Sequence, residues 1–362
     1  LDPDRQYSCA YFNSPNDTLE QAQINKKELI SKKLLLEEGH IHDFLKLIFF
    51  NTNSAIDHWV MKLSKIVRKI QNKIRTSNYV SKSKHNVAHH YDLSDKLYEL
   101  FLDPDRQYSC AYFNSPNDTL EQAQINKKEL ISKKLLLKEG QSVLDIGCGW
   151  GGMAAHIYKK SNASVVGVTL SEEQYAYANQ RKINEKLDKV EYRLQDYRNV
   201  NESYDRIVSV GMFEHVGTSH YQEFFNKVHD LLNDTGVALI HTIGRLTEPT
   251  NNDPWIEKYI FPGGYIPALS ETMSRVEKSG LALTDVQVLR FHYAETLKRW
   301  RYNFYDNIDK VKELYDEKFC RMWDFYLSSS QASFEEAGLV VFQLQLSKNK
   351  KTVPDKRDYL LA

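Results

Sequence analysis

The stretch SVLDIGCGWGG, residues 142–152, decides how this chain folds. Residues 143–146, apolar except for Asp145, predict a short buried strand, and the glycines that follow it open a helix. Glycine lets the backbone approach a ligand closely and leaves the N–H groups of the next helix free for a carboxylate or phosphate. The stretch therefore indicates a turn that binds a nucleotide-type cofactor, with a tight structural turn as the alternative.

The residues after this turn alternate between strands and helices. We expect strands at 143–146, 164–169, 190–194, 204–210 and 237–243, and helices at 153–160, 172–186 and 222–232. Strands separated by helices at this spacing build a parallel, doubly wound α/β sheet. Residues 283–289 and 339–346 are expected to complete it as an antiparallel pair, which gives a mostly parallel sheet of seven strands. The aromatic-rich stretch after residue 243 is too long for a loop.

A dinucleotide fits the glycine turn poorly. An NAD site places an acid at the end of the second strand to hold the ribose hydroxyls, whereas Thr169 stands there in this chain. The spacing D-x-G-x-G-x-G-G also differs from the dinucleotide pattern G-x-G-x-x-G.

Composition excludes several classes of protein. The 48 Lys and Arg balance the 48 Asp and Glu, so a globally basic nucleic-acid binder is not expected. The apolar runs are far shorter than the roughly 20 residues that span a bilayer. The four cysteines form no CxxC or Cys/His metal spacing, so we expect no metal site and no disulfide framework, and a reducing cytoplasm fits best.

One segment occurs twice. Residues 1–39 repeat residues 102–140, and Glu37 against Lys138 is the only difference. Two copies separated by unrelated sequence do not make a solenoid or a propeller. We interpret residues 1–39 as an orphan duplicate, real or an artefact of assembly, and expect it to be inert; the alternative is that it competes with residues 102–140 for their place, as in domain swapping. The chain begins with Leu1, so its true N-terminus and any targeting segment are left open.

Residues 40–85 predict a basic amphipathic helical segment. Trp59, Leu63, Ile66, Ile70 and Ile74 form an apolar stripe, and no acid occurs between Asp57 and Asp92. Such a helix suits an anionic membrane surface. The alternative is an ordinary helix packed on its own domain.

Eight motifs then agree with one family. In chain order they are NVAHHYDLS, YSCAYF, VLDIGCGWGG, GVTLSEEQ, QDYR, DRIVSVGMFEHVG, LIHTIG and WIEKYIFPGGYIP. Together they resemble the cyclopropane-fatty-acyl-phospholipid synthases, whose wider group includes the mycolic acid cyclopropane synthases. The resemblance covers residues 86–348, which we assign to one catalytic domain followed by a tail, 349–362.

The resemblance implies a class I S-adenosylmethionine methyltransferase fold with added helices that form a lipid tunnel. It implies transfer of a methyl group from S-adenosylmethionine to the cis double bond of an acyl chain in an unsaturated phospholipid. The implied cofactor residues are Tyr108 and Ser109 at the methionine end, the turn Leu144, Asp145, Ile146, Gly147, Cys148, Gly149, Trp150, Gly151 and Gly152, then Thr169, Leu170, Ser171 and Gln174 near the ribose, and Gln195 and Asp196 near the adenine.

The same resemblance implies a bound bicarbonate as the base that removes a proton from the added methyl. Its implied ligands are the backbone at Cys110 and Ile243 and the side chains of Glu214, His241 and Tyr293. Glu214 follows the fourth strand and His241 lies on the fifth, so both are expected at the carboxyl edge of the sheet. Tyr293 has core packing as its alternative.

Three further sites each have more than one possible role. The HHYD residues 89–92 predict a cofactor lid or simply the start of a helix, and Phe261, Gly263, Gly264 and Tyr265 predict either a tunnel wall or an aromatic core turn. Ser330 stands where some members of the family have a cysteine, which we interpret as structural or modulatory.

The leading hypothesis is thus a lipid C-methylating synthase. Its expected partner is an unsaturated phospholipid in a bilayer, with peripheral association on the cytoplasmic face of the membrane and no nucleic acid; whether the protein is a homodimer is left open. The alternatives are a methyltransferase of another lipid or an amine on the same fold, and a membrane-bound pseudoenzyme that does not bind S-adenosylmethionine.

Overall fold

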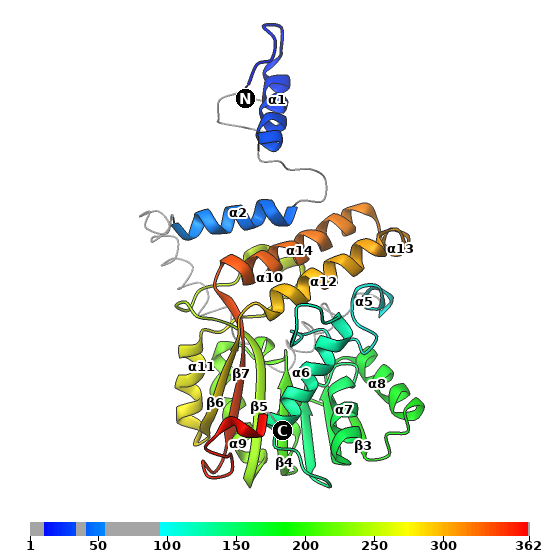
Figure 1. The fold of residues 1–362 in the computed structure, drawn as a ribbon, viewed down its shortest axis with the longest axis vertical. Coiled ribbons are helices and arrows are strands. Elements are labelled where there is room, and N and C mark those ends of the chain that lie inside the picture. Colours follow the sequence, from blue (N-terminus) through cyan, green and yellow to red (C-terminus); the bar gives the residue numbers. More distant parts are fainter. Residues whose placement is uncertain (1–10, 34–40, 55–94, 361–362) are drawn as a thin grey trace.

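The computed structural model describes residues 11–33, 41–54 and 95–360. In that part of the chain, seven strands form one sheet (Figure 1). They are β1 (Ser142–Ile146), β2 (Ser164–Thr169), β3 (Val190–Leu194), β4 (Tyr204–Val210), β5 (Leu232–Arg245), β6 (Ala282–Leu289) and β7 (Leu339–Ser347). The predicted α/β sheet of seven strands is confirmed.

The strand order is β3-β2-β1-β4-β5-β7-β6. Neighbours from β3 to β5 pair in parallel, whereas β7 pairs antiparallel with both β5 and β6. The order reverses between β1 and β4, and doubly wound sheets bind ligands outside the carboxyl ends of their strands at such a point. The topology therefore places the glycine turn and the ends of β4 and β5 at one edge.

Strand β5 is longer than its apolar pattern predicts. Its pairing with β4 steps from Tyr204↔Leu232 to Arg206↔Val237, so residues 233–236 form an irregularity within the ladder. The expected start at residue 237 is therefore five residues late: β5 begins at Leu232, directly after α9 (Tyr221–Leu231), and Leu232 already pairs with Tyr204 of β4.

Helices cover the sheet and its carboxyl edge. Those beside the sheet are α6 (Leu120–Lys134), α7 (Gly152–Ser161), α8 (Glu172–Asn184), α9 (Tyr221–Leu231) and α11 (Leu269–Val276). Those gathered beyond its carboxyl edge are α2 (Ile41–Ser54), α5 (Asp95–Phe101), α10 (Pro254–Tyr259), α12 (His292–Asp306), α13 (Ile308–Leu314) and α14 (Glu317–Glu336) (Figure 1). Glu214 lies in a short 3₁₀ turn, Phe213–His215, directly after β4.

The helices beyond the carboxyl edge share an aromatic core. Phe101 of α5 contacts Trp300 of α12 and Trp323 of α14, with ring centroids 5.9 and 5.8 Å apart. Trp300 and Phe101 are fully buried, and aromatic side chains of this size each bury about 150–250 Å². The expected aromatic-rich subregion is therefore a folded helical layer with its own core.

The two copies of the repeat form the same helix. The first copy forms α1 (Leu19–Lys33) and the second forms α6. In each, the hydroxyl of the preceding threonine accepts the N–H of the third helical residue, at 3.2 Å. Only α6 packs on the sheet; Figure 1 shows α1 standing apart from it. The local sequence thus determines the helix, and the context determines its packing.

Two expectations concern residues outside the described ranges. Most of the basic segment, residues 55–85, and the HHYD residues 89–92 are not described. Among the described residues, no helix combines the length and the apolar character that crossing a membrane requires, and no cluster of His, Cys, Asp and Glu could hold a metal ion.

Candidate active site

The glycine turn after β1 has a backbone that only glycine adopts easily. Gly147, Gly149 and Gly151 have φ angles of +78°, +55° and +81°. A Cβ on Gly147 would lie 2.8 Å from Met212, and one on Gly151 would lie 2.5 Å from the Tyr192 hydroxyl. A larger residue at Gly147 or Gly151 would therefore clash with these neighbours, and the turn requires glycine at both positions.

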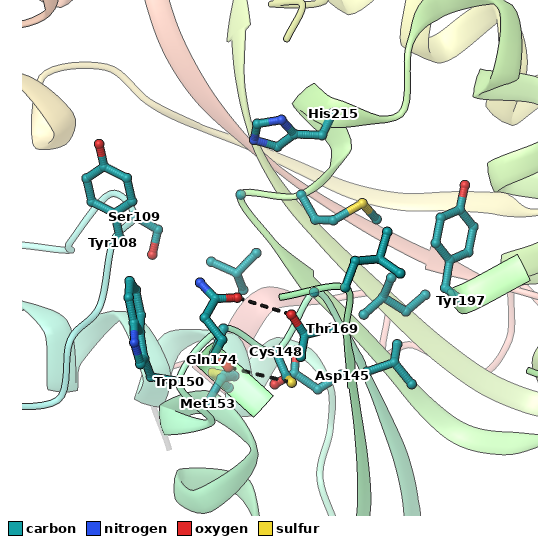
Figure 2. Close-up of a pocket in the computed structure, with 18 of the residues that line it drawn as sticks. Tyr108, Ser109, Asp145, Cys148, Trp150, Met153, Thr169, Gln174, Tyr197 and His215 are labelled. Atoms are coloured by element: carbon teal, nitrogen blue, oxygen red, sulfur yellow. Dashed lines mark hydrogen bonds between the residues drawn. The ribbon is translucent and has the colours of Figure 1, made fainter. Parts of the chain in front are cut away.

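A cavity opens at this turn, and we name it the glycine-turn cavity. Figure 2 shows Tyr108 and Trp150 on one side of it and Tyr197 on the other, with Thr169 and Gln174 between them. Most of the predicted cofactor residues line it: Tyr108, Ser109, Asp145, Ile146, Gly147, Cys148, Gly149, Trp150, Thr169, Leu170, Gln174, Gln195 and Asp196. These residues come from four separate motifs, which thus meet in one place.

Four predicted cofactor residues do not line this cavity. Leu144 is a buried core residue of β1, and Gly151 and Gly152 form the start of α7. Ser171 caps α8, because its hydroxyl accepts the Gln174 N–H at 3.2 Å. Their place in the structure is behind the cavity wall, where they fix the turn and the helix.

Polar side chains of the cavity hold one another in place. The Thr169 hydroxyl donates to Gln174 Oε1 at 3.1 Å, as the dashed line in Figure 2 marks. Asp196 binds Arg198 with both carboxylate oxygens, at 2.9 and 2.6 Å. Asp145 is buried with Oδ2 unpartnered, and burial raises the pKa of its carboxyl to about 7.

The sequence interpretation missed several lining residues: Arg106, Gln107, Met153, Val168, Tyr197, Arg198, Val210, Gly211, Met212, His215, Val216 and Pro262. Val210 to His215 could have been found, because they continue β4 past the carboxyl edge, where Glu214 was expected. Pro262 lies in the motif WIEKYIFPGGYIP, but its neighbours Phe261 and Gly263 were expected at the acyl tunnel and not at the cofactor.

A second cavity adjoins the first, and we name it the aromatic cavity. All five predicted catalytic residues line it: Cys110, Glu214, His241, Ile243 and Tyr293. Tyr108, Ser109, Gly211 and His215 line both cavities. A group bound in the glycine-turn cavity can therefore meet a group bound in the aromatic cavity at these four residues.

Glu214 and His241 each leave one buried polar atom unpartnered. The Ile243 N–H donates to Glu214 Oε1 at 2.6 Å, while Glu214 Oε2 has no partner. The Gln343 amide donates to His241 Nδ1 at 3.1 Å, so the hydrogen of the neutral ring sits on Nε2, which also has no partner. The site thus presents one carboxyl oxygen and one N–H donor.

Burial sets the protonation of both groups. It raises the pKa of Glu214 from 4.5 to about 7, against the effect of the backbone hydrogen bonds. Burial, aided by the charges of Lys127 and Lys134, holds the pKa of His241 well below its ordinary value. At neutral pH His241 is therefore uncharged, and Glu214 is divided between its acid and its carboxylate form.

The other three predicted catalytic residues, Cys110, Ile243 and Tyr293, are each engaged in contacts within the protein. The Ile243 N–H serves Glu214, so Ile243 positions that carboxyl. Cys110 donates its thiol to the Ala111 carbonyl at 3.2 Å, and burial raises the pKa of the thiol, which makes it a poor nucleophile. Tyr293 packs against Phe334 with ring centroids 4.8 Å apart.

Aromatic, aliphatic and polar side chains complete the walls of the aromatic cavity. Phe261, Gly264 and Tyr265 line the aromatic cavity, whereas Gly263 does not. Ser330 lines it from α14, and Leu45 and Phe49 line it from α2. The Tyr108 and Tyr326 hydroxyls are 2.7 Å apart. Gln343, Leu45 and Phe49 were missed, because none belongs to a motif and each reaches the site from an element distant in sequence.

The family is settled by comparison with known proteins. The family model described as mycolic acid cyclopropane synthetase matches residues 1–43 and 79–344. This chain belongs to that family. The match includes the duplicate, so the repeated segment is family sequence in both places.

Individual members of the family are similar to this chain in sequence and in structure. The cyclopropane-fatty-acyl-phospholipid synthase of Escherichia coli K12 is 42% identical over 259 residues, 72% of this chain and 66% of the relative, so the chain spans about two thirds of that protein. The cyclopropane synthase MmaA2 from Mycobacterium tuberculosis is 35% identical with a TM-score of 0.69, over 73% of this chain and 98% of that one. The cyclopropane synthase CmaA1 complexed with SAH and CTAB is 36% identical with a TM-score of 0.69, over 73% of this chain and 97% of that one. The predicted family and the class I methyltransferase fold are confirmed, and the chain is an enzyme of the cyclopropane synthase family.

Proposed function

We propose that this enzyme transfers a methyl group from S-adenosylmethionine to the cis double bond of an acyl chain in an unsaturated phospholipid and closes a cyclopropane ring. The observation that carries the proposal is the pair of unpartnered buried atoms, Glu214 Oε2 and His241 Nε2, in an aromatic cavity that adjoins the glycine-turn cavity. A methyltransferase that acts on an amine has no need of that pair.

The glycine-turn cavity fits S-adenosylmethionine. A relative of 36% identity carries SAH in its crystal structure, and Gly147 and Gly149 lie in the turn of this chain where a ligand would approach the backbone. Tyr108 and Ser109 would hold the methionine end, and Thr169 and Gln174 the ribose. When bound, this cofactor supplies a methyl group on a sulfonium leaving group.

The aromatic cavity fits an acyl chain. Its apolar walls exclude water, which would otherwise capture the carbocation left on the chain when the alkene attacks the methyl carbon. Tyr293, Phe261 and Tyr326 line the cavity. The face of an aromatic ring can stabilise a cation through its quadrupole. Tyr108, shared by both cavities, lies where the methyl group would cross.

Glu214 and His241 fit a small anion such as bicarbonate. The His241 Nε2–H would donate to an oxygen of the anion, and Glu214, with a pKa of about 7, can donate as the acid or accept as the carboxylate. Once the methyl carbon has bonded to the chain, one of its C–H bonds breaks. Its electron pair would close the ring onto the cationic carbon, and Glu214 and His241 would hold the anion that takes up the proton.

The phospholipid substrate implies a membrane surface. Helix α2 contributes Leu45 and Phe49 to the aromatic cavity and exposes Leu47, Ile48 and Phe50 on its other side. An exposed apolar strip beside a lipid cavity supports peripheral contact with a bilayer, which would lie on the cytoplasmic side of the membrane. The basic residues 62–84 belong to this part of the proposal and lie outside the described ranges.

The test is to incubate the enzyme with labelled S-adenosylmethionine and vesicles of unsaturated phospholipid and then weigh the acyl chains. We expect a gain of one methylene with loss of the double bond. Vesicles of the saturated phospholipid with the same headgroup are the control and should gain nothing. Label found only on a headgroup or on a soluble amine would overturn the proposed acceptor.

A further inference from the structure

Lys127 on α6 is a fully buried cation that lies next to the cofactor cavity. Its Nζ donates to Gln107 Oε1 and to Ser109 Oγ, each at 2.8 Å. Within the described ranges, no carboxylate forms an ion pair with it. A buried ammonium without a carboxylate partner is costly. The site therefore favours a ligand that brings negative charge to its vicinity.

A second side chain of the same helix holds the same segment. The Gln124 amide donates to the carbonyl oxygens of Gln107 and Ser109, at 3.1 and 3.0 Å. Gln124 and Lys127 lie three residues apart and so share one face of α6. Helix α6 thus fixes the backbone and the side chains of residues 107–109, and Gln107 and Ser109 line the glycine-turn cavity.

The direction of the Lys127 hydrogen bond orients the Ser109 hydroxyl. An ammonium group only donates, so Ser109 Oγ is the acceptor, and the hydroxyl hydrogen is left to point elsewhere. Ser109 faces the cavity beside Tyr108, where the methionine end of the cofactor is placed. That end carries a carboxylate, which accepts hydrogen bonds. It also supplies the negative charge that the Lys127 ammonium does not find in an ion pair.

We propose that Lys127 is a positioning residue for the cofactor carboxylate: it turns the Ser109 hydroxyl into the cavity as a donor and places a buried positive charge behind it. The inference rests on binding of S-adenosylmethionine in the glycine-turn cavity. It does not depend on which acceptor is methylated.

The environment of Lys127 makes its charge, and with it the affinity for the cofactor carboxylate, depend on pH. Burial lowers the pKa of Lys127 to about 8, with Asp103 acting in the opposite direction. The titratable and charged groups that interact with it are Asp103, Asp105, Cys110, Lys128, Asp145 and His241. As the pH rises through about 8, the ammonium loses its proton, and the charge behind Ser109 disappears.

The experiment measures calorimetric affinity for S-adenosylhomocysteine and for its decarboxylated analogue. K127M keeps the unbranched stem and removes the charge; we expect it to weaken S-adenosylhomocysteine binding roughly tenfold to a hundredfold, the range for a hydrogen bond to a charged group. The decarboxylated analogue should bind wild type and K127M within about threefold of each other, because it lacks the group that Lys127 serves. Equal losses for both ligands, or no loss for either, would overturn the inference.

The repeat supplies a matched control. Lys26 is the residue of the first copy that corresponds to Lys127, and its Nζ donates to Gln23 within α1. K26M makes the same chemical change in the same local sequence and should leave both affinities unchanged. A loss in K26M equal to that in K127M would refute a role specific to the site.

Two further measurements keep the inference testable if K127M folds poorly. S109A retains Lys127 and should bind S-adenosylhomocysteine more weakly while its affinity for the decarboxylated analogue stays unchanged, as in K127M. The double variant K127M/S109A should show no further loss. Wild-type affinity for S-adenosylhomocysteine should fall as the pH rises through about 8, while that for the decarboxylated analogue stays level; parallel profiles would contradict the inference. If wild type binds neither ligand at any pH, the proposed function fails instead.

Discussion

Glu214 is a carboxyl group that can change protonation near neutral pH. E214Q should bind S-adenosylhomocysteine as wild type does, because Glu214 lines the aromatic cavity and not the glycine-turn cavity. It should lose most turnover on unsaturated vesicles, because an amide cannot exchange a proton with a bound anion. Turnover and calorimetric affinity measured on the same preparation check this. Unchanged turnover would reject the role of Glu214 in holding the base.

The same variant has a predicted effect on stability. Because the pKa of Glu214 rises from 4.5 to about 7 on folding, its contribution to stability is fully present below pH 4.5 and is lost as the pH rises through 7. The difference corresponds to roughly 3 kcal/mol at pH 8. Urea unfolding at pH 5 and pH 8 should therefore show that E214Q loses less stability across this interval than wild type. Equal losses would mean that Glu214 is not held neutral by burial.

At the scale of elements, α2 joins the aromatic cavity to the surface. His42 and Lys46 bind Glu335 of α14, at 3.2 and 3.1 Å, and Figure 1 shows α2 lying across α14. Its exposed side carries Phe50, which is 62% exposed. The helix thus has a polar attachment to α14, one apolar side over the cavity and another toward solvent.

This arrangement predicts that F50S weakens binding to phospholipid vesicles without changing affinity for S-adenosylhomocysteine. Removing one exposed phenyl ring should lower the vesicle partition coefficient roughly tenfold to a hundredfold, because it removes about 1.5–3 kcal/mol of apolar burial. Sedimentation with vesicles measures it. The control is I183S on α8, an equally exposed apolar position (70%) on a helix beside the sheet. Equal losses in the two variants would argue against α2 as the docking element.

At the scale of the whole molecule, the duplicate is the unusual feature. Residues 1–39 contain Tyr7, Ser8 and Cys9, which correspond to Tyr108, Ser109 and Cys110. Only the second copy continues into the glycine turn, and only α6 lies against the sheet. The duplicate therefore repeats the sequence of a cofactor site without the glycine-turn sequence that follows it in the second copy. Tyr7, Ser8 and Cys9 themselves lie outside the described residues.

Deleting residues 1–39 should leave the melting temperature, S-adenosylhomocysteine affinity and turnover within error of the full chain. The physical reason is that the deleted helix adds nothing to the cores around the sheet. Calorimetry and the vesicle assay measure these quantities. A fall in activity or a loss of folding would show that the first copy takes the place of the second, and a change of oligomeric state on deletion would identify domain exchange.

The sequence by itself determined the sheet, the glycine turn and most of the cofactor cavity. These are local properties: apolar runs form the strands, and Gly147 and Gly149 permit the positive φ angles of the turn. The motif residues Glu214 and His241 were placed correctly because consecutive parallel strands end at the same edge. The same locality explains why α1 and α6 are both helices.

Only the tertiary structure decided the partners of those residues. Gln343 lies opposite His241 on β7, 102 residues further along the chain, and thereby assigns the His241 hydrogen to Nε2. Lys127 and Lys26 occupy identical local sequences, yet only Lys127 contacts Ser109 in the cavity wall. Leu45 and Phe49 reach the aromatic cavity from α2 without any motif. The physical reason is that hydrogen-bond direction, burial and charge depend on what folding brings near a side chain, which the surrounding sequence does not state.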